Sequence, residues 1–305
     1  MYLIIGGSGF LGRYLIKNIL LHTQDEVIAT YNSNRPKFEN ERLEWFNYNV
    51  QNDPAILADK LKNYKKKAKV IYLAAYHHPD KVEKNYKQAW EINIVSLAKI
   101  INALPELKSF FYASTDSVYG EGSFEHPFDE NSKRYPLNLY GKQKALAEDI
   151  VLAHGGKVIR YPFIIGPSLV EGKPHFFDKI VASLENGEEV QLFSDSYRST
   201  ISFDQAAKFL IQLIENSNIS FIPDVLNISS DKPLSKFDVG IEIAEKLALN
   251  KNLILPIKQS EQSGIFEARR PFITVLDNKP TLGKYTIYGV SNENKKIIKV
   301  TEYKL

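Results

Sequence analysis

The 305-residue sequence contains no cysteine. This absence excludes disulfide bonds, thiolate nucleophiles, and zinc or iron–sulfur sites built on cysteine. No stretch approaches the run of about 18 or more apolar residues that a membrane-spanning helix needs. The opening residues also lack the basic segment of a signal peptide. We therefore expect a soluble, cytoplasmic protein that makes no contact with a membrane.

An excess of charge is also missing. The formal net charge is only +3, so nothing in the charge balance indicates nucleic acid, and none is expected as a partner. Hydrophobic residues make up 44% of the chain and charged residues 25%, which is ordinary globular composition and argues against disorder. The length allows a large core, divided between one big domain or two smaller ones.

Short β-rich segments alternate with helical patterns through the first half of the chain. Strands are predicted at residues 2–7, 26–31, 43–50, 69–75, 109–115 and 157–166. Helices are predicted at residues 11–22, 53–64, 87–104 and 139–155. Near-continuous apolar strands separated by helices imply a parallel sheet that is covered on both faces. The sequence therefore predicts an α/β fold with a doubly wound parallel sheet, a Rossmann fold.

The pattern becomes irregular after about residue 160. Helices are predicted at 176–187, 204–217 and 235–249, and a late strand at 224–230. We interpret this half as a smaller C-terminal cap, from which some segments return to the main sheet. The predicted division is a main domain of residues 1–160 with returning segments at about 199–229, and a cap of residues 161–198 and 230–305.

A glycine cluster, GGSGFLG (6–12), lies between the first predicted strand and the first predicted helix. It satisfies the pattern G-x-x-G-x-x-G through Gly6, Gly9 and Gly12. Such clusters also occur in ordinary turns, but this one opens a βαβ unit. In that context the missing side chains let the backbone approach a pyrophosphate, and the helix N-terminus offers free N–H groups. We predict that residues 1–160 form a dinucleotide-binding domain.

The loop after the second predicted strand indicates which dinucleotide binds. It reads ATYNSNR (29–35) and contains no acidic residue before Glu39. An acid at this place would bind the ribose hydroxyls and repel a 2′-phosphate. Ser33 and Arg35 instead suit a phosphate, although Arg35 is also compatible with a loop arginine that binds no ligand. The loop therefore favours NADP(H) over NAD(H).

A tyrosine and a lysine, Tyr140 and Lys144, stand four residues apart in YGKQK (140–144), on one face of a predicted helix. The nearby ammonium is expected to lower the pKa of the tyrosine from its ordinary value of about 10. Such a tyrosine can exchange a proton with a sugar or alcohol oxygen during hydride transfer. With 17 tyrosines in the chain, the spacing also arises by chance as an exposed contact.

The strand predicted at 109–115 ends in hydroxyl side chains. In a doubly wound sheet, ligands bind beyond the carboxyl ends of the strands. Ser114 and Thr115 are therefore expected to face this crevice, where Thr115 can hydrogen-bond the oxygen that Tyr140 protonates. The alternative is that the two hydroxyls only cap a turn.

Together these features resemble the extended short-chain dehydrogenase/reductase family, and within it the dTDP-4-dehydrorhamnose reductases. The segments that carry the likeness are STDSVYG (114–120), AAYHHPDKVEKNYKQAWEIN (74–93) and RRPFITVLD (269–277). The resemblance implies NADPH-dependent reduction of the C4 keto group of a nucleotide-linked 6-deoxy-4-hexulose, which supplies deoxysugars for surface polysaccharide. Open alternatives are a sugar-nucleotide 4-epimerase or another extended family member, and a non-catalytic dinucleotide-binding regulatory protein. Family members are commonly dimers, so a homodimer is a candidate assembly.

The resemblance also assigns roles to residues. Thr115, Tyr140 and Lys144 would be catalytic. The implied cofactor contacts, besides Ser33 and Arg35, are Gly6, Gly9, Phe10, Leu11, Gly12, Asn49, Val50, Leu73, Ala74, Ala75, Asn93, Tyr140 and Lys144. An aspartate is usual at the position of Asn49, and Asn93 matches a position that supports the active-site helix and its proton path.

The implied substrate contacts are Asp116, His175, Arg198 and Arg270. The two arginines suit the phosphates of a nucleotide sugar, and each is also compatible with a surface ion pair. No metal is expected, because the adjacent histidines at 77 and 78 lack a supporting carboxylate–histidine spacing.

Overall fold

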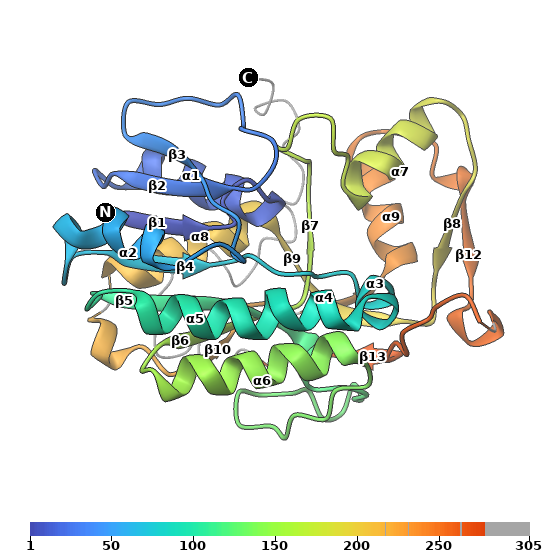
Figure 1. Cartoon of the computed structure of the whole chain (residues 1–305). Coiled ribbons are helices and arrows are strands. Elements are labelled where there is room, and N and C mark those ends of the chain that lie inside the picture. Colours follow the sequence, from blue (N-terminus) through green and yellow to red (C-terminus); the bar gives the residue numbers. More distant parts are fainter. Residues whose placement is uncertain (217, 231, 263, 278–305) are drawn as a thin grey trace.

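The computed structural model describes residues 1–216, 218–230, 232–262 and 264–277. Its centre is a seven-stranded parallel sheet with the strand order β10-β6-β5-β4-β1-β2-β3 (Figure 1). The strands are β1 (Tyr2–Ile5), β2 (Val27–Tyr31), β3 (Leu43–Asn47), β4 (Lys69–Tyr72), β5 (Ser109–Thr115), β6 (Lys157–Tyr161) and β10 (Val225–Asn227). The order reverses at β1, which is flanked by β2 and β4, and this reversal opens a crevice at the carboxyl edge. The predicted doubly wound parallel sheet is confirmed.

Helices cover both faces of this sheet (Figure 1). On one face, α1 (Phe10–His22) and α8 (Phe203–Asn216) share an apolar core with the strands. On the other face, α2 (Ala55–Leu61), α5 (Ser96–Ala103) and α6 (Leu139–Ala153) form a second core. Because the sheet is buried on both sides, its strands are nearly continuous apolar runs. No helix in the described ranges combines the length and the apolarity that crossing a membrane requires.

The sequence predicts one continuous helix over residues 87–104, and the structure interrupts it. The chain forms α3 (Pro79–Lys84), α4 (Tyr86–Trp90), a π-helical segment over Glu91–Val95, and then α5. A π-helical turn accommodates one more residue per hydrogen-bonded ring than an α-helical turn and is frequent at functional sites. Here the π-helical segment contains Asn93, one of the predicted cofactor contacts.

The sequence also predicts a single strand over residues 157–166, and the structure divides it in two. β6 ends before Pro162, and β7 (Phe163–Ile165) follows in a separate sheet. Proline has no N–H to donate to a strand ladder, so the chain leaves the large sheet there. β7 pairs with β9 (Tyr197–Ser202), and β9 also pairs with β11 (Pro233–Ser235) and β13 (Ile273–Thr274).

A third apolar core holds the cap together. α7 (Phe176–Glu185) and α9 (Lys236–Lys246) pack against each other beside a two-stranded sheet of β8 (Val190–Phe193) and β12 (Ile254–Ile257). After β9 the chain returns through α8 and β10 to the large sheet. The domain boundaries remain a prediction, and the cap residues 278–305 lie outside the described ranges.

The turn between β1 and α1 depends on glycines. Gly6 has φ +86°, and a Cβ added there would lie 2.8 Å from the backbone nitrogen of Ala74. A Cβ at Gly12 would lie 2.5 Å from the carbonyl oxygen of Gly7. Any other residue would push the turn away from β4 or from its own helix.

We expect Gly6→Ala to lower the free energy of unfolding by about 2 to 3 kcal/mol, because it combines an unfavourable φ with a backbone clash. Gly155→Ala is the matched control, since Gly155 has φ +72° but no atom within 4 Å of an added Cβ. The control should cost only about 1 kcal/mol. Urea unfolding of both variants measures the difference, and equal losses would show that the close approach to β4 contributes nothing.

Candidate active site

The glycine-rich turn forms one side of the site. α1 begins at Phe10 with Gly9 at its N-cap, and its first turn has neither a side-chain cap nor an acidic residue. Its N–H groups and the positive end of the helix dipole are therefore available to an anion. Together with the close backbone packing at Gly6 and Gly12, this arrangement fits the pyrophosphate of a dinucleotide.

Other predicted cofactor contacts follow the carboxyl ends of neighbouring strands. Asn49 and Val50 lie after β3, and Leu73, Ala74 and Ala75 lie after β4, all half-buried. Because these strands are parallel, their carboxyl ends meet at the edge that holds the glycine-rich turn. The structure brings these residues to one crevice, and their contact with a dinucleotide stays a prediction.

The loop after β2 holds Ser33 and Arg35 on the surface. The Nη1 atom of Arg35 lies 2.9 Å from Oε1 of Glu39, and the two side chains are 54% and 66% exposed. A pair so exposed to solvent contributes little free energy. A 2′-phosphate could therefore take the place of Glu39 beside Arg35 at small cost.

The three predicted catalytic residues meet at the end of β5. Thr115 is the last residue of the strand, Tyr140 and Lys144 lie one turn apart on α6, and the hydroxyl of Thr115 is close enough to Tyr140 to lower the pKa of its phenol. The Nζ atom of Lys144 donates to the carbonyl oxygen of Ala113 at 2.5 Å and lies 4.0 Å from the ring centre of Tyr112. If the spacing of Tyr140 and Lys144 had arisen only by chance, nothing would require both residues to lie beside Thr115 at the end of β5.

The expected pKa of Tyr140 is wrong in direction. Burial and, after it, the carboxylate of Asp116 raise the pKa of Tyr140, while the hydrogen bond with Thr115 opposes them. The ammonium of Lys144 is engaged by strand β5, and burial lowers its pKa to about 7 against the opposing charge of Glu148. Tyr140 is therefore protonated at neutral pH, which is the form that a proton donor needs.

A buried amide links α6 to the crevice. Asn93, only 2% exposed, accepts a hydrogen bond from the backbone N–H of Tyr76 at 2.8 Å and donates to its carbonyl oxygen at 3.2 Å. It also donates to Oε1 of Gln143 at 2.8 Å, next to Lys144 on α6. The π-helical segment contains Asn93, and these contacts support the predicted role of this residue beside the active-site helix.

Two predicted substrate contacts, Asp116 and Arg198, lie beside Thr115, the predicted catalytic threonine. Arg198, from β9, places its Nε 3.7 Å from Oδ2 of Asp116, which directly follows Thr115. Asp116 is 5% exposed, and within the described part of the chain its Oδ2 has no hydrogen-bond partner. Burial raises the pKa of Asp116, while Arg198 and neighbouring hydroxyls oppose the shift.

Arg270, the other predicted phosphate contact, is partly engaged. Its Nη2 lies 2.7 Å from Oδ2 of Asp80. This nitrogen therefore forms the ion pair that the sequence left open as an alternative to a phosphate contact. Its Nε is buried without a hydrogen-bond partner among the described residues. The guanidinium carbon lies 4.9 Å from the ring centre of Phe266.

A cavity of about 340 Å³, which we call the cap pocket, is lined by Arg198, Arg270 and a third cation, Lys236. Desolvation and the neighbouring charges of Arg270 and Arg198 lower the pKa of Lys236. Phe193 and Phe266 supply apolar walls. Lys236 was not predicted as a site residue, because no motif in the sequence marks the first residue of α9.

His175 lies at the N-cap of α7, beside the glycine-rich turn. Its ring centre is 4.8 Å from that of Phe10 and 5.0 Å from that of Phe203. Burial lowers the pKa of His175 to about 4, so the ring is neutral at pH 7. The structure thus places His175 on the cofactor side of the crevice, outside the cap pocket, and its contact with a substrate stays a prediction.

Comparison with protein families gives a match over residues 1–293 to the RmlD substrate binding domain. The chain belongs to this family. Among curated relatives, it is similar to methionine adenosyltransferase 2 subunit beta of Xenopus laevis. The two are 27% identical over 262 residues, which cover 84% of this chain and 74% of that protein.

Solved structures share the fold of this RmlD-family chain. A hypothetical dTDP-4-dehydrorhamnose reductase from Sulfolobus tokodaii has a TM-score of 0.78 at 24% identity and covers 98% of this chain and 99% of its own. A dTDP-4-dehydrorhamnose reductase from Bacillus anthracis in complex with NADP has a TM-score of 0.76 at 19% identity and covers 97% and 96%. The resemblance predicted from the sequence is confirmed by the family match.

A buried carboxylate fastens α6 of this RmlD-family chain to the sheet. Glu148, one turn after Lys144, is 0% exposed and accepts from Oγ of Ser114 at 2.5 Å. Arg160 of β6 donates to Glu148 through Nη2 at 2.7 Å and Nε at 3.0 Å. Nη1 of Arg134 donates at 3.1 Å. Glu148 was not predicted as a site residue, although it lies four residues after Lys144 and therefore on the same face of α6.

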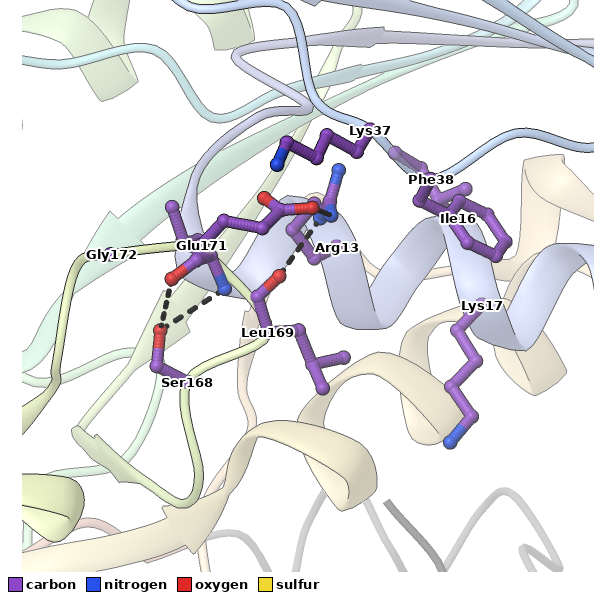
Figure 2. Close-up of a pocket in the computed structure, with 10 residues that line it drawn as sticks. Arg13, Ile16, Lys17, Lys37, Phe38, Ser168, Leu169, Glu171 and Gly172 are labelled. Atoms are coloured by element: carbon purple, nitrogen blue, oxygen red, sulfur yellow. Dashed lines mark hydrogen bonds and ion pairs between the residues drawn. The ribbon is translucent and has the colours of Figure 1, made fainter. Parts of the chain in front are cut away.

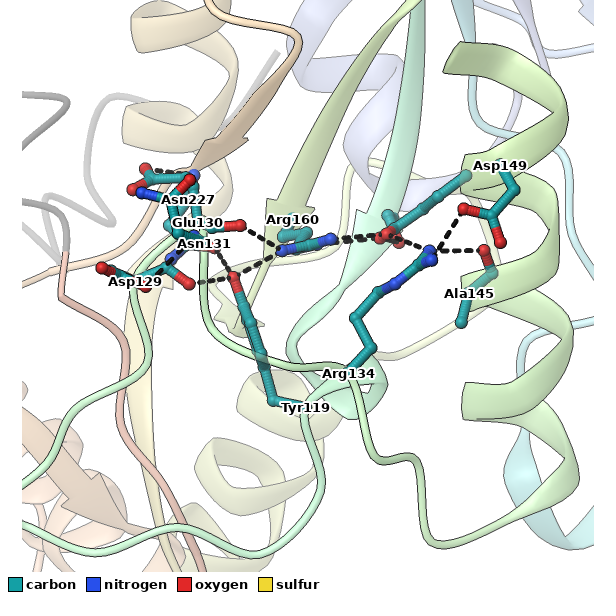
Figure 3. Close-up of polar contacts among 11 residues, drawn as sticks. Tyr119, Asp129, Glu130, Asn131, Arg134, Ala145, Asp149, Arg160 and Asn227 are labelled. Atoms are coloured by element: carbon teal, nitrogen blue, oxygen red, sulfur yellow. Dashed lines mark hydrogen bonds and ion pairs between the residues drawn. The ribbon is translucent and has the colours of Figure 1, made fainter. Parts of the chain in front are cut away.

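The far side of Arg160 reaches the last strand of the sheet. Its Nη1 donates to the hydroxyl of Tyr119 at 2.7 Å, and that hydroxyl donates to Oδ1 of Asn227 at 2.8 Å (Figure 3). Asn227 belongs to β10, so the Glu148–Arg160 pair connects α6, β5, β6 and β10.

We expect Glu148→Gln to lower the free energy of unfolding by about 3 kcal/mol, because it leaves the guanidinium of Arg160 buried without its counter-charge. Asp149→Asn is the control on the neighbouring position, since Asp149 is 53% exposed in its ion pair with Arg134. That change should cost less than about 0.5 kcal/mol. Urea unfolding compares the two, and a loss for Glu148→Gln as small as that of the control would contradict the importance of the buried pair.

Proposed function

We propose that the chain is a sugar-nucleotide reductase that uses NADPH in preference to NADH and reduces the C4 keto group of a nucleotide-linked 6-deoxy-4-hexulose. The observation that carries the proposal is the meeting of Thr115, Tyr140 and Lys144 between the glycine-rich turn and the cationic cap pocket. The product would supply deoxysugars for surface polysaccharide.

The residues around the ketone divide the chemistry between them. A bound nicotinamide dinucleotide supplies the hydride for C4. Tyr140, held protonated by its surroundings, donates a proton to the carbonyl oxygen as that oxygen gains negative charge. Thr115 orients the same oxygen, and Lys144 supports the phenolate that Tyr140 becomes.

The cap pocket supports a nucleotide diphosphate as the anchoring part of the substrate. Arg198, Arg270 and Lys236 place three cations together, and guanidinium groups suit phosphate oxygens. Arg198 also contacts Asp116, so a diphosphate held there lies close to the catalytic threonine. The phenyl rings of Phe193 and Phe266 offer faces for an apolar or aromatic part of the nucleotide.

The preference for NADPH is supported by the loop after β2. The first acid in that loop, Glu39, is paired with Arg35 and follows the end of β2 by several residues. No carboxylate therefore stands directly after the strand to bind the ribose hydroxyls and repel a 2′-phosphate.

A regulatory subunit is the second candidate function. The similarity to methionine adenosyltransferase 2 subunit beta favours it. The complete set of Thr115, Tyr140 and Lys144 favours the enzyme, because a protein that only binds a dinucleotide does not need a proton donor.

The deciding assay follows NADPH and NADH oxidation at 340 nm with nucleotide-4-keto-6-deoxy sugars. We expect oxidation with the dTDP sugar and a higher kcat/KM for NADPH than for NADH. Oxidation that is faster with NADH would overturn the cofactor preference. Dinucleotide binding without turnover across the dTDP, UDP and GDP sugars would move the assignment to a regulatory subunit or to a 4-epimerase.

We expect Tyr140→Phe to lower kcat by about 100-fold or more, because it removes the proton donor. Affinity for NADPH, measured by fluorescence titration, should stay within about twofold. Tyr135→Phe is the control, since Tyr135 is 72% exposed on the preceding loop and should retain full activity. Turnover retained by Tyr140→Phe would remove this residue from the mechanism.

We expect Lys236→Gln to raise KM for the nucleotide sugar about tenfold and to leave KM for NADPH unchanged, because one of the three phosphate-facing charges is lost. Lys232→Gln, an exposed lysine paired with Glu242 outside the cap pocket, serves as the control. An equal effect of both substitutions would show only a general dependence on surface charge.

A further inference from the structure

A second cavity lies beside α1, and none of the three predicted catalytic residues lines it. Its volume is about 570 Å³, which is within the range of small-molecule sites. It is bounded by α1, by the loop after β2 and by the loop before α7 (Figure 2). We call it the α1 pocket and define it by Arg13, Lys17, Lys37, Phe38, Leu169 and Glu171.

Arg13 is the chemical centre of the α1 pocket. Its side chain is only 7% exposed, its Nε donates to the carbonyl oxygen of Leu169 at 3.2 Å, and its Nη2 lies 2.8 Å from Oε1 of Glu171. Its third nitrogen, Nη1, is buried and has no hydrogen-bond partner in the described ranges. A buried donor without a partner is costly, so this nitrogen is suited to donate a hydrogen bond to a ligand oxygen.

The charges of the α1 pocket favour an anion. Arg13, Lys17 and Lys37 line it together with a single carboxylate, Glu171. Figure 2 shows Glu171 reaching from the loop before α7 toward the guanidinium of Arg13. Glu171 is 47% exposed, so a stronger anion can displace it into solvent.

The rest of the α1 pocket is apolar. The guanidinium carbon of Arg13 lies 5.9 Å from the ring centre of Phe38 and 5.3 Å from that of Trp45. Leu169 and Phe38 line the space next to it. The pocket therefore combines one buried donor, two ammonium groups and a hydrophobic wall.

We propose that the α1 pocket binds the phosphomonoester group of a small molecule between Arg13 and Lys37, with the apolar part of that molecule on Phe38 and Leu169. A phosphomonoester has three terminal oxygens, enough to satisfy Nη1 of Arg13 and the ammonium of Lys37 together.

Two sources carry this group. One is the 2′-phosphate of NADP(H), lying at Lys37 instead of beside Arg35, because Lys37 and Phe38 belong to the same loop that leaves β2, where the ribose of a dinucleotide lies. The other is a separate phosphorylated metabolite. The proposal does not depend on the proposed reductase reaction, and its test measures binding without turnover.

The test is isothermal titration of the full chain with phenyl phosphate, alone and in the presence of saturating NADP⁺ or NAD⁺. We expect saturable binding that Lys37→Gln weakens about fivefold. Glu171→Gln should strengthen it about threefold, because the competing carboxylate is gone, and a gain of affinity cannot come from misfolding. Lys99→Gln, an exposed lysine on α5, is the control and should change nothing.

The dinucleotide arms identify the source. Phenyl phosphate displaced by NADP⁺ but not by NAD⁺ supports the 2′-phosphate, and Lys37→Gln should then weaken NADP⁺ alone. Binding that persists with both dinucleotides supports a separate metabolite. Displacement of phenyl phosphate by both NADP⁺ and NAD⁺ would show that the probe binds in the cofactor crevice, and this result would overturn the proposal. The absence of saturable binding, or binding that Lys37→Gln and Glu171→Gln leave unchanged, also overturns it.

Discussion

The buried ion pair between Glu148 and Arg160 is the interaction on which the site depends. It fastens α6 to the strands that carry the crevice. Lys144 lies one turn before Glu148, and Thr115 directly follows Ser114, which donates to Glu148. A buried pair of this kind adds little net stability relative to apolar residues, but breaking it is costly. The pair matters here for geometry, because it fixes the position of α6 relative to β5 and β6.

The large sheet and the cap contribute different kinds of chemical group to the site. The carboxyl edge of the sheet offers backbone groups at the glycine-rich turn, where side chains would obstruct a ligand. The cap offers charged side chains from β9, α9 and the segment around Arg270. Asp116 connects the two, since it follows Thr115 and faces Arg198.

The sequence predicted the large sheet because its central strands β1, β4 and β5 are buried on both faces, so their apolar signal is local and continuous. It also predicted the turn at Gly6 and the pair of Tyr140 and Lys144, whose spacing carries their chemistry. It did not predict the direction of the pKa shift of Tyr140, because the burial of this residue and its closeness to Asp116 arise only in the tertiary structure. Lys236 was missed for the same reason, since its neighbours in the cap pocket come from distant segments.

The loop before α7 contacts α1 at several places, and the hydroxyl of Tyr14 also donates to the carbonyl oxygen of Pro167. Leu169 and Glu171 hold Arg13, and His175 packs against Phe10 at the other end of the same turn of helix. The segment that leads into the cap is therefore built onto the helix that faces the pyrophosphate. Any displacement of that helix by a bound dinucleotide would therefore be passed on to the cap. If the cap binds the proposed nucleotide sugar, thermodynamic reciprocity would require that sugar to alter dinucleotide affinity by the same factor.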